Sequence, residues 1–431
     1  MRIAFLSYGT RGDAQPQVVL ASALSARGYR VRVAAPENLR RLVEDAGIEY
    51  APLFGNSQEI LESEAGRRWL SSGNVRAFMK EIGAISAKIN PQIFESAVRA
   101  TSDADAIVGG TLAEDLSFTL AQKRDVPFVL AHTIPFEVTG EYACPLVTTA
   151  RLPFGFLNRL TYGLFRKLGW EVNRSTLNPF RESLGLAPLP TTILGGAHEH
   201  VDTILQLWSA HVVPHPADAA PARTTTGYVR MTPETRERLG EATPPAAFVD
   251  WLGRGPAPVY LGFGSMPVLD PEGMANAALA VATELDLRIV LSAGWTSSSA
   301  VERLANERAF FLRSVDHSWL LRRCVAAVHH GGAGTTAASL EAGIPTLICS
   351  VFADQPFWGA RVSRLGVGAH VPFAKLDRRT LAGALRDILT EDVRTRAANL
   401  GEKLRAEDGT TAAVEAIVKK LGPPRGERAA A

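Results

Sequence analysis

Short apolar runs alternate with amphipathic stretches along this chain of 431 residues, and the alternation restricts the folds that it can adopt. Residues 2–8 form the first apolar run, and the stretch 15–28 behind it carries apolar residues at helical spacing. Further runs occupy 29–36, 105–110, 127–133, 258–266, 288–294, 309–315, 325–332 and 345–352. Strands that are apolar throughout, with helices between them, indicate parallel β-sheets covered on both faces.

The alternation occurs twice, and a segment rich in Pro, Ala and Thr separates the two halves. A chain of this length exceeds one ordinary hydrophobic core. We therefore predict an α/β fold with two Rossmann-like domains whose parallel sheets face each other across a cleft. The predicted boundaries are an N-terminal domain over 1–213, a linker over 214–227 and a C-terminal domain over 228–405, with a final helix in 406–431 that could cross back.

Charge balance and cysteine content exclude several classes of protein. Lys and Arg total 46 and Asp and Glu total 44, so a formal charge of +2 indicates no nucleic-acid partner. The chain has no run of about 18 apolar residues, so no integral membrane span is expected. Three cysteines far apart in the sequence suit a reducing compartment, and we expect a cytoplasmic protein. Histidines and acidic residues lack the spacing of a metal site, so no metal is predicted.

The strongest motif is VHHGGAGTTAASLEAGIP at 328–345. A buried strand runs into histidines and three glycines, and a helix begins near Thr335. Glycines let backbone N–H groups approach a ligand closely, and a helix N-terminus favours negative charge. The motif therefore predicts a diphosphate site that includes His330, although a glycine-rich turn with threonine caps is the plain alternative.

Two other strand ends add to this motif. YLGFGSM places Ser265 after one strand, and VFADQPFW places Asp354 and Gln355 after another. A carboxylate beside a carboxamide suits hydrogen bonding to neighbouring sugar hydroxyls. Alone, each feature is as compatible with a turn or a helix cap, and Trp358 could belong to the core or border the sugar. In series, they predict a nucleotide-sugar pocket.

The segments GFGSM, VHHGGAGTTAASLEAGIPTL, FADQPFWGARVSRLG and GTRGDAQP together resemble GT-B glycosyltransferases. The resemblance is closest to sterol and lipid glucosyltransferases and to vancomycin-type antibiotic glycosyltransferases. It implies the two-domain GT-B fold and metal-independent, inverting transfer of a hexose from UDP-glucose or a dTDP-sugar. The acceptor would be a hydroxyl of a hydrophobic small molecule such as a sterol, polyketide or macrolide. No cofactor is implied beyond the donor, and the oligomeric state is left open.

The resemblance also implies roles for individual residues. His330, Gly332, Gly334, Thr335 and Ser265 match positions at the donor diphosphate, Asp354 and Gln355 match the pair that holds the sugar, Ser314 and Val315 match the segment that contacts the base, and Gly12 completes the donor set. Thr111, Thr133 and Phe136 follow two strands of the first half and are expected to border the acceptor. Ser314 replaces the tryptophan of plant relatives and Ala338 replaces their glutamate, which leaves UDP and dTDP both open.

Asp13, in GTRGDAQP, allows three interpretations. It could cap the following helix, with Pro16 in the first turn. A dinucleotide site is disfavoured because the third glycine of GxGxxG is missing and an anion would repel a pyrophosphate. If the diphosphate belongs to the second domain, Asp13 faces it across the cleft and can act as general base toward an acceptor hydroxyl. We expect the helix dipole to keep this carboxylate ionised.

Two other functions fit the same scaffold. A nucleotide-sugar 2-epimerase would convert the donor alone into a new isomer. A non-catalytic nucleotide-sugar-binding protein would bind the donor without releasing diphosphate to any acceptor.

Overall fold

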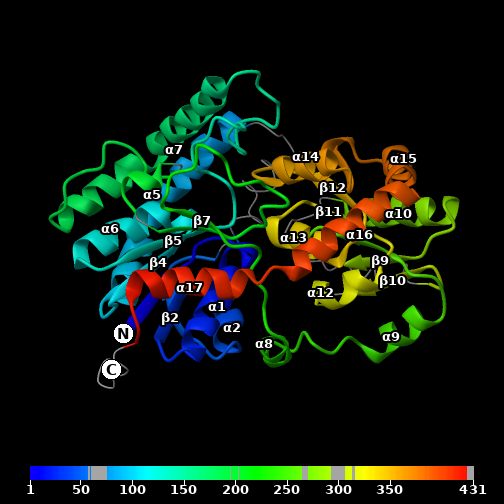
Figure 1. Ribbon diagram of the computed structural model, residues 1–431, viewed down its shortest axis with the longest axis horizontal. Coiled ribbons are helices and arrows are strands. Elements are labelled where there is room, and N and C mark those ends of the chain that lie inside the picture. Colours follow the sequence, from blue (N-terminus) through cyan, green and yellow to red (C-terminus); the bar gives the residue numbers. More distant parts are fainter. Residues whose placement is uncertain are drawn as a thin grey trace.

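The structure, a computed structural model, describes residues 1–56, 59, 75–194, 196–201, 203–264, 270–292, 306–312 and 316–424. Two parallel sheets dominate it, one in each half of the chain (Figure 1). The predicted α/β class with two Rossmann-like domains is confirmed.

The first sheet has seven strands in the order β3-β2-β1-β4-β5-β6-β7. The strands are β1 Arg2–Leu6, β2 Arg30–Pro36, β3 Glu49–Leu53, β4 Ala106–Gly110, β5 Phe128–His132, β6 Ile204–Gln206 and β7 Arg223–Thr225. The helices of this half are α1 Arg11–Ala26, α2 Arg40–Glu44, α5 Val75–Thr101, α6 Glu114–Arg124 and α7 Gly155–Ser183. Because β1 pairs with both β2 and β4, the loops that follow β1 and β4 lie side by side at the carboxyl edge.

The second sheet has six strands in the order β10-β9-β8-β11-β12-β13. The strands are β8 Val259–Gly262, β9 Ile289–Ser292, β10 Ala309–Leu312, β11 Ala326–His329, β12 Thr346–Ser350 and β13 Gly368–Pro372. The helices that follow the first domain are α8 Pro233–Arg238, α9 Ala246–Gly253, α10 Pro271–Glu284, α12 His317–Leu320, α13 Ala333–Ala342, α14 Gln355–Leu365, α15 Arg378–Ile388, α16 Glu391–Ala406 and α17 Gly409–Leu421. Short 3-10 helices are η1 Glu37–Leu39, η2 Thr111–Ala113, η3 Ala197–Glu199, η4 Leu321–Arg323 and η5 Phe373–Lys375.

The central strands of each sheet are buried on both faces, which explains why they are apolar throughout. Every residue of β4 and of β5 is buried, and so is every residue of β1 except Arg2. Alternate residues of β1 enter different cores: Ile3 and Phe5 pack with α1, whereas Ala4 and Leu6 pack on the side of α5 and α6. Parallel sheets enclosed in this way require such runs.

A separate apolar core joins the two domains. Trp208, Val212 and Val213, from the segment after β6, pack in one cluster with Phe357 and Trp358 of α14. The two tryptophans are each about 1% exposed. This contact holds the second domain against the first at the carboxyl side of both sheets.

The domain boundaries differ from the prediction. β7 lies inside the predicted linker 214–227 and extends the first sheet. The chain stays on the first domain after β7, since Met231 is buried in the core that covers α1. The crossing therefore follows α8, because Phe248 of α9 packs in the second domain. Short strands with few apolar residues, such as β7, carry no pattern that marks them in the sequence.

The end of the described chain returns to the first domain. α17 lies beside α1, and its Val414, Ile417 and Leu421 enter the same core as Val18 and Leu24 (Figure 1). The final helix that could cross back therefore does so. No helix within the described residues is long and apolar enough to cross a bilayer.

Candidate active site

The loop after β1 ends in a reciprocal cap on α1. Thr10 has extended backbone (φ −96°, ψ −177°) and its side chain accepts a hydrogen bond from Gly12 N. Asp13 is the third helical residue, and its Oδ2 accepts from Thr10 N at 2.8 Å. The interpretation of Asp13 as the N-cap is therefore wrong, because Thr10 occupies that position and Asp13 completes a capping box. Pro16 consequently lies past the first turn.

Burial raises the pKa of Asp13 to about 6, even though the hydrogen bonds from Thr10 act in the opposite direction. Desolvation therefore outweighs the hydrogen bonds of the cap, but a pKa of about 6 still agrees with the expectation of an ionised carboxylate. The carboxylate is ionised at neutral pH and is a stronger base than an exposed aspartate.

The glycine loop between β11 and α13 is held from below by His329. His329 is fully buried; its Nδ1 accepts from Gly331 N at 3.0 Å and its Nε2 lies 3.2 Å from Ser339 Oγ. A histidine that accepts at Nδ1 carries its proton on Nε2, and burial lowers the pKa of His329 well below its ordinary value. His329 is thus a neutral structural group that orients the loop.

His330, the next residue, faces the start of α13. A Cβ atom on Gly264 would lie 2.9 Å from its ring, and one on Gly332 would lie 2.5 Å from Nε2, so both glycines are needed for the imidazole to fit. Nδ1 of His330 is buried and has no hydrogen-bond partner in the described part of the molecule. Burial lowers the pKa of His330 to about 4, which makes the ring neutral and able to donate one N–H to an anion.

The first turn of α13 is open to a ligand. Gly332 is its N-cap and provides no side-chain hydrogen bond, which leaves the first backbone N–H groups for another acceptor. Thr335 lies in this turn and is half-buried, and Gly334 is exposed. Together with the unpartnered His330 Nδ1, this arrangement fits a phosphate group.

Asp354 and Gln355 begin α14 next to this loop. Asp354 occupies the N-cap position but its side chain does not cap the helix; instead its Oδ2 accepts from Trp358 Nε1 at 2.6 Å. Gln355 is buried, and its Oε1 accepts from Val351 N at 2.7 Å and Phe352 N at 3.2 Å. The amide nitrogen of Gln355 and the second oxygen of Asp354 remain for a ligand.

Asp13 and Asp354 interact electrostatically across the two domains. Burial raises the pKa of Asp354 to about 6, the hydrogen bond from Trp358 lowers it, and the charge of Asp13 raises it further. A carboxylate on the first domain therefore lies within Coulomb range of the carboxylate beside the predicted phosphate loop. The carboxyl edges of both sheets meet at this point, as the ligand-binding rule for open parallel sheets requires.

Comparison with known proteins agrees with this geometry. The family model described as glycosyltransferase family 28 N-terminal domain matches residues 3–129. The model described as erythromycin biosynthesis protein CIII-like, C-terminal domain, matches residues 276–422. A sterol 3-beta-glucosyltransferase of Arabidopsis thaliana is 34% identical over 98% of this chain and 68% of its own length. The chain belongs to this family of glycosyltransferases.

Other relatives are longer than this glycosyltransferase. The sterol 3-beta-glucosyltransferase of Komagataella phaffii is 30% identical over 97% of this chain, which spans 34% of that protein. Solved structures share the GT-B fold. The calicheamicin glycosyltransferase CalG4 superposes with a TM-score of 0.72 at 18% identity, covering 98% of this chain and 99% of its own. VinC in complex with dTDP gives 0.65 at 18% identity, covering 97% and 98%.

The predicted acceptor residues of the glycosyltransferase are mostly inside the first domain. Phe136 is 2% exposed and stacks on Phe165 of α7 with ring centroids 5.6 Å apart. Thr111 is also buried, and its hydroxyl accepts from Thr133 N at 3.3 Å. Phe136 and Thr111 therefore lie beneath the surface of the first domain, and their place at the border of the acceptor stays a prediction.

Leu112 was not singled out by the sequence, yet it lies at the mouth of the site. Its side chain is 59% exposed, and a Cβ atom on Gly9 would meet both the Leu112 methyl group and the Asp13 carboxylate. Leu112 thus provides an exposed apolar surface beside Asp13. No periodic pattern marks it, because its position depends on the pairing of β1 with β4.

A cluster of buried charged residues lies beneath the acceptor side. Glu114 Oε2 is 3.0 Å from His132 Nε2, Glu137 Oε1 is 3.9 Å from His132 Nδ1, and Arg223 Nε is 3.4 Å from Glu137 Oε2. All four residues are buried. Burial raises the pKa of Glu114 to about 7; for His132 the lowering by burial is outweighed by the two carboxylates, so its pKa is raised. The ligand atoms of Glu114, His132 and Glu137 lie within 4.8 Å of one another and could hold a metal ion, but Arg223 already brings a positive charge there.

Three predicted donor residues, Ser265, Ser314 and Val315, lie outside the described residues. Gly12 is exposed, and its N–H is used within the α1 cap. The arrangement that the structure brings together is therefore Asp13, His330, the start of α13, and the Asp354–Gln355 pair.

The two adjacent histidines predict opposite mutational effects. His329→Leu leaves Gly331 N without its buried partner, at a cost of about 1 to 3 kcal/mol, and lowers the thermal midpoint by several degrees, while Ser339 Oγ keeps its hydrogen bond to Thr336 O. His330→Leu removes a ring whose Nδ1 has no partner, and leaves the midpoint nearly unchanged. Differential scanning fluorimetry of the two purified variants measures both effects, and an equal drop would contradict the assignment.

Proposed function

We propose that this glycosyltransferase moves a hexose from a nucleoside diphosphate sugar to a hydroxyl of a hydrophobic small molecule, with Asp13 as general base. The observation that carries the proposal is that the charge of Asp13, on one domain, acts on Asp354 beside the open phosphate loop on the other. One half of the cleft then supplies a base, and the other supplies groups for a diphosphate and a sugar. The sterol-directed relatives support a hydrophobic acceptor.

The proposed reaction is a single displacement. The acceptor oxygen attacks the anomeric carbon while its proton passes to the Asp13 carboxylate, and the bond from that carbon to the diphosphate oxygen breaks. The electron pair leaves with the nucleoside diphosphate. Attack from the face opposite to the leaving group inverts the anomeric centre, so an α-linked donor yields a β-glycoside.

His330 and α13 would stabilise the departing diphosphate. The neutral imidazole donates one N–H, and the uncapped first turn of α13 offers backbone N–H groups and its positive dipole end. Asp354 and Gln355 would orient the sugar through its hydroxyls. The donor nucleotide is UDP or dTDP: solved neighbours hold dTDP, and the relatives are glucosyltransferases. Thermal shifts with UDP-glucose and dTDP-glucose decide between them, since a bound ligand raises the midpoint.

The variant Asp13→Asn separates the role of Asp13 as a base from its role in the cap of α1. Asparagine retains an oxygen that can accept from Thr10 N, so the start of α1 and the thermal midpoint stay intact. Turnover falls by about 100- to 10,000-fold because the amide cannot accept the acceptor proton. Release of the nucleoside diphosphate with a sterol acceptor measures the loss of turnover, and donor binding measured by calorimetry is the control. Retention of most turnover in folded protein would contradict the assignment of the base.

Activity should depend on pH through the two carboxylates. The pKa of Asp13 and that of Asp354 are each raised to about 6, so the base form is complete above this pH and is lost as pH falls through it. We expect kcat/KM to fall on the acid side with an apparent pKa near 6 that belongs to the pair. A profile that stays flat down to pH 4.5 would contradict the raised values at the site.

The proposed transfer needs no metal ion, because neutral His330 and the α13 dipole stabilise the leaving group. Turnover after incubation with EDTA and gel filtration should equal that of the untreated enzyme within about 20%, far from the large losses that follow removal of a catalytic metal. The Glu114–His132–Glu137 cluster makes this assay informative. A loss restored by added Mg²⁺ or Zn²⁺ would overturn metal independence.

Incubation with the donor alone tests the two alternatives. A 2-epimerase would produce a sugar isomer without an acceptor, and a non-catalytic binding protein would bind donor yet release no diphosphate with any acceptor. The proposed transferase requires the acceptor for rapid release of diphosphate.

A further inference from the structure

Large apolar side chains are exposed on one short part of the first domain. Among the described residues, ten large hydrophobic side chains are exposed, and six of them lie between 147 and 168: Val147, Phe154, Phe156, Leu160, Leu164 and Leu168. The exposed fraction is 61% for Leu160 and 50% for Leu168. Scattered exposed leucines are ordinary, but a contiguous group on one element marks an interaction surface.

The orientation of α7 explains this concentration. Phe156, Leu160, Leu164 and Leu168 follow one another at intervals of four residues and form a ridge along the helix, here called the leucine ridge. The buried side of the same helix carries polar residues, including Asn158, whose Nδ2 donates to Gly140 O at 2.7 Å. The inward side also carries the buried aromatic residues Tyr162 and Trp170, so α7 is apolar on its inward side and again along the exposed ridge.

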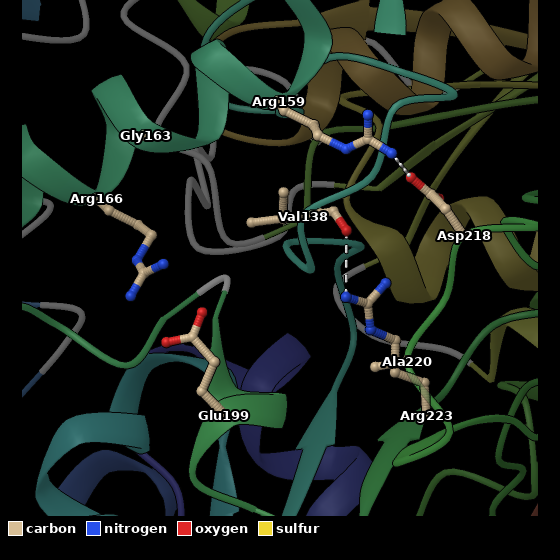
Figure 2. A pocket seen from close by; sticks show the side chains of 8 residues that line it. All are labelled: Val138, Arg159, Gly163, Arg166, Glu199, Asp218, Ala220 and Arg223. Atoms are coloured by element: carbon tan, nitrogen blue, oxygen red, sulfur yellow. Dashed lines mark hydrogen bonds and ion pairs between the residues drawn. The ribbon is translucent and has the colours of Figure 1, made fainter. Parts of the chain in front are cut away.

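Another side of α7 is also polar. Figure 2 shows Arg159 pointing to Asp218, with which it forms an ion pair at 2.6 Å, and Arg166 pointing toward Glu199 across a cavity of about 400 Å³. These arginines lie beside the leucine ridge on the helical wheel. α7 packs on its own domain through Phe165, Trp170 and Leu177 as well as through these polar groups, whereas the leucine ridge joins no apolar core of the described residues.

The segment around the leucine ridge is basic. From Tyr142 to Trp170 the chain contains Arg151, Arg159, Arg166 and Lys167 and no Asp or Glu. Lys167 is exposed between two leucines of the ridge. Asp218 pairs with Arg159 on this side, whereas neither Arg151 nor Lys167 forms an ion pair among the described residues, so the unpaired charge beside the apolar strip is positive, as in helices that lie on anionic lipid surfaces.

Two further arginines, Arg361 and Arg364, lie with Arg151 next to the exposed phenylalanines. Arg151, Arg361 and Arg364 line one cavity of about 300 Å³, together with Glu141, whose Oε1 accepts from Ala217 N. No carboxylate forms an ion pair with any of these three arginines in the described part of the chain. Arg364 donates to Thr149 O at 2.5 Å, which places it against the loop that carries Val147 and leads to Phe154. An external anion would satisfy these groups.

We propose that the leucine ridge, the adjoining Phe154 and the basic groups beside them form a docking surface for a lipid bilayer with anionic headgroups. The leucines and phenylalanines would enter the boundary between headgroups and acyl chains, and the arginines and Lys167 would meet the phosphates. A second copy of the chain is a poor occupant. A two-fold contact centred on α7 would bring the basic residues of one copy against those of the other.

This surface deepens the proposed function and rests on it for the identity of the acceptor. α7 reaches the acceptor side of the cleft from within, because Phe165 stacks on Phe136 directly after β5. A hydrophobic acceptor partitions into bilayers, so a docked enzyme would take it from the membrane without exposing it to water. The partner of the site is then the lipid surface that holds the acceptor.

Co-sedimentation with vesicles tests the surface without donor or acceptor. The full chain is mixed with vesicles of phosphatidylcholine and phosphatidylglycerol, or of phosphatidylcholine alone. We expect binding to the mixed vesicles and at least about tenfold weaker binding to the neutral ones. Each basic residue near an anionic surface strengthens binding about fivefold, and several such residues lie at this surface. The variant Leu160→Glu with Leu164→Glu should lose binding to both. Val249→Glu, at a residue of α9 that is 44% exposed on the other domain, should bind like the unchanged protein.

Further variants keep the test decisive. Arg151→Gln with Arg364→Gln should weaken binding only to the anionic vesicles, whereas Arg254→Gln, at an exposed residue of the second domain, should not. Absence of binding by the unchanged protein would overturn the proposal, as would equal binding of the Leu160→Glu/Leu164→Glu protein. A dimer in sedimentation velocity that this double substitution dissociates would show a second copy instead.

Turnover assays separate this inference from the proposed function. The Leu160→Glu/Leu164→Glu protein should release diphosphate normally with a sterol dissolved in detergent, and at least about tenfold more slowly with the sterol in anionic vesicles. Equal release in both settings would overturn the role of the surface in acceptor capture. Vesicle binding without diphosphate release in any setting would contradict the proposed function and leave the docking surface standing.

Discussion

The buried indole of Trp358 is the contact on which both halves of the molecule depend. Its ring fills the apolar core shared with Trp208 between the two domains, and its N–H donates to Asp354 at 2.6 Å. One side chain therefore joins the domain contact to the orientation of a cleft carboxylate. Because this core is closely packed, the position of Asp354 relative to Asp13 follows from the packing of the domains.

In the site next to this contact, burial shifts the pKa values of the acidic and basic groups. Asp13 and Asp354 each reach a pKa of about 6, and His330 is held near 4. Two carboxylates close together resist ionisation, whereas a buried imidazole resists protonation. The resulting site has basic carboxylates near neutral pH and a neutral donor beside the α13 terminus. That arrangement matches a reaction in which a proton is removed on one side and negative charge develops on the other.

Features of the fold that depend on neighbouring residues in the sequence could be predicted, and features that depend on contacts with distant segments of the chain could not. Most strands of both sheets, though not β3, β6, β7 and β13, and the loop before α13 were predicted because continuous apolar runs and glycines act locally. The cap of α1 was misassigned because the extended backbone of Thr10, and not residue preference, decides where a helix begins. Leu112 and the Glu114–His132 pair were missed, since each acquires its surroundings only when β1, β4 and β5 pair.

Two parallel-sheet domains, a glycine-rich loop that begins at His330, and polar residues after successive strands follow from the sequence alone. Which of these groups come together depends on how the two domains pack. Asp13 and Asp354 are far apart along the chain, and their proximity, like their raised pKa values, arises from the contact between domains. The outward leucines of α7 were equally hidden, because helical spacing shows that a face is apolar but not which way it points. Burial and charge environment are properties of segments brought together, and no single segment contains them.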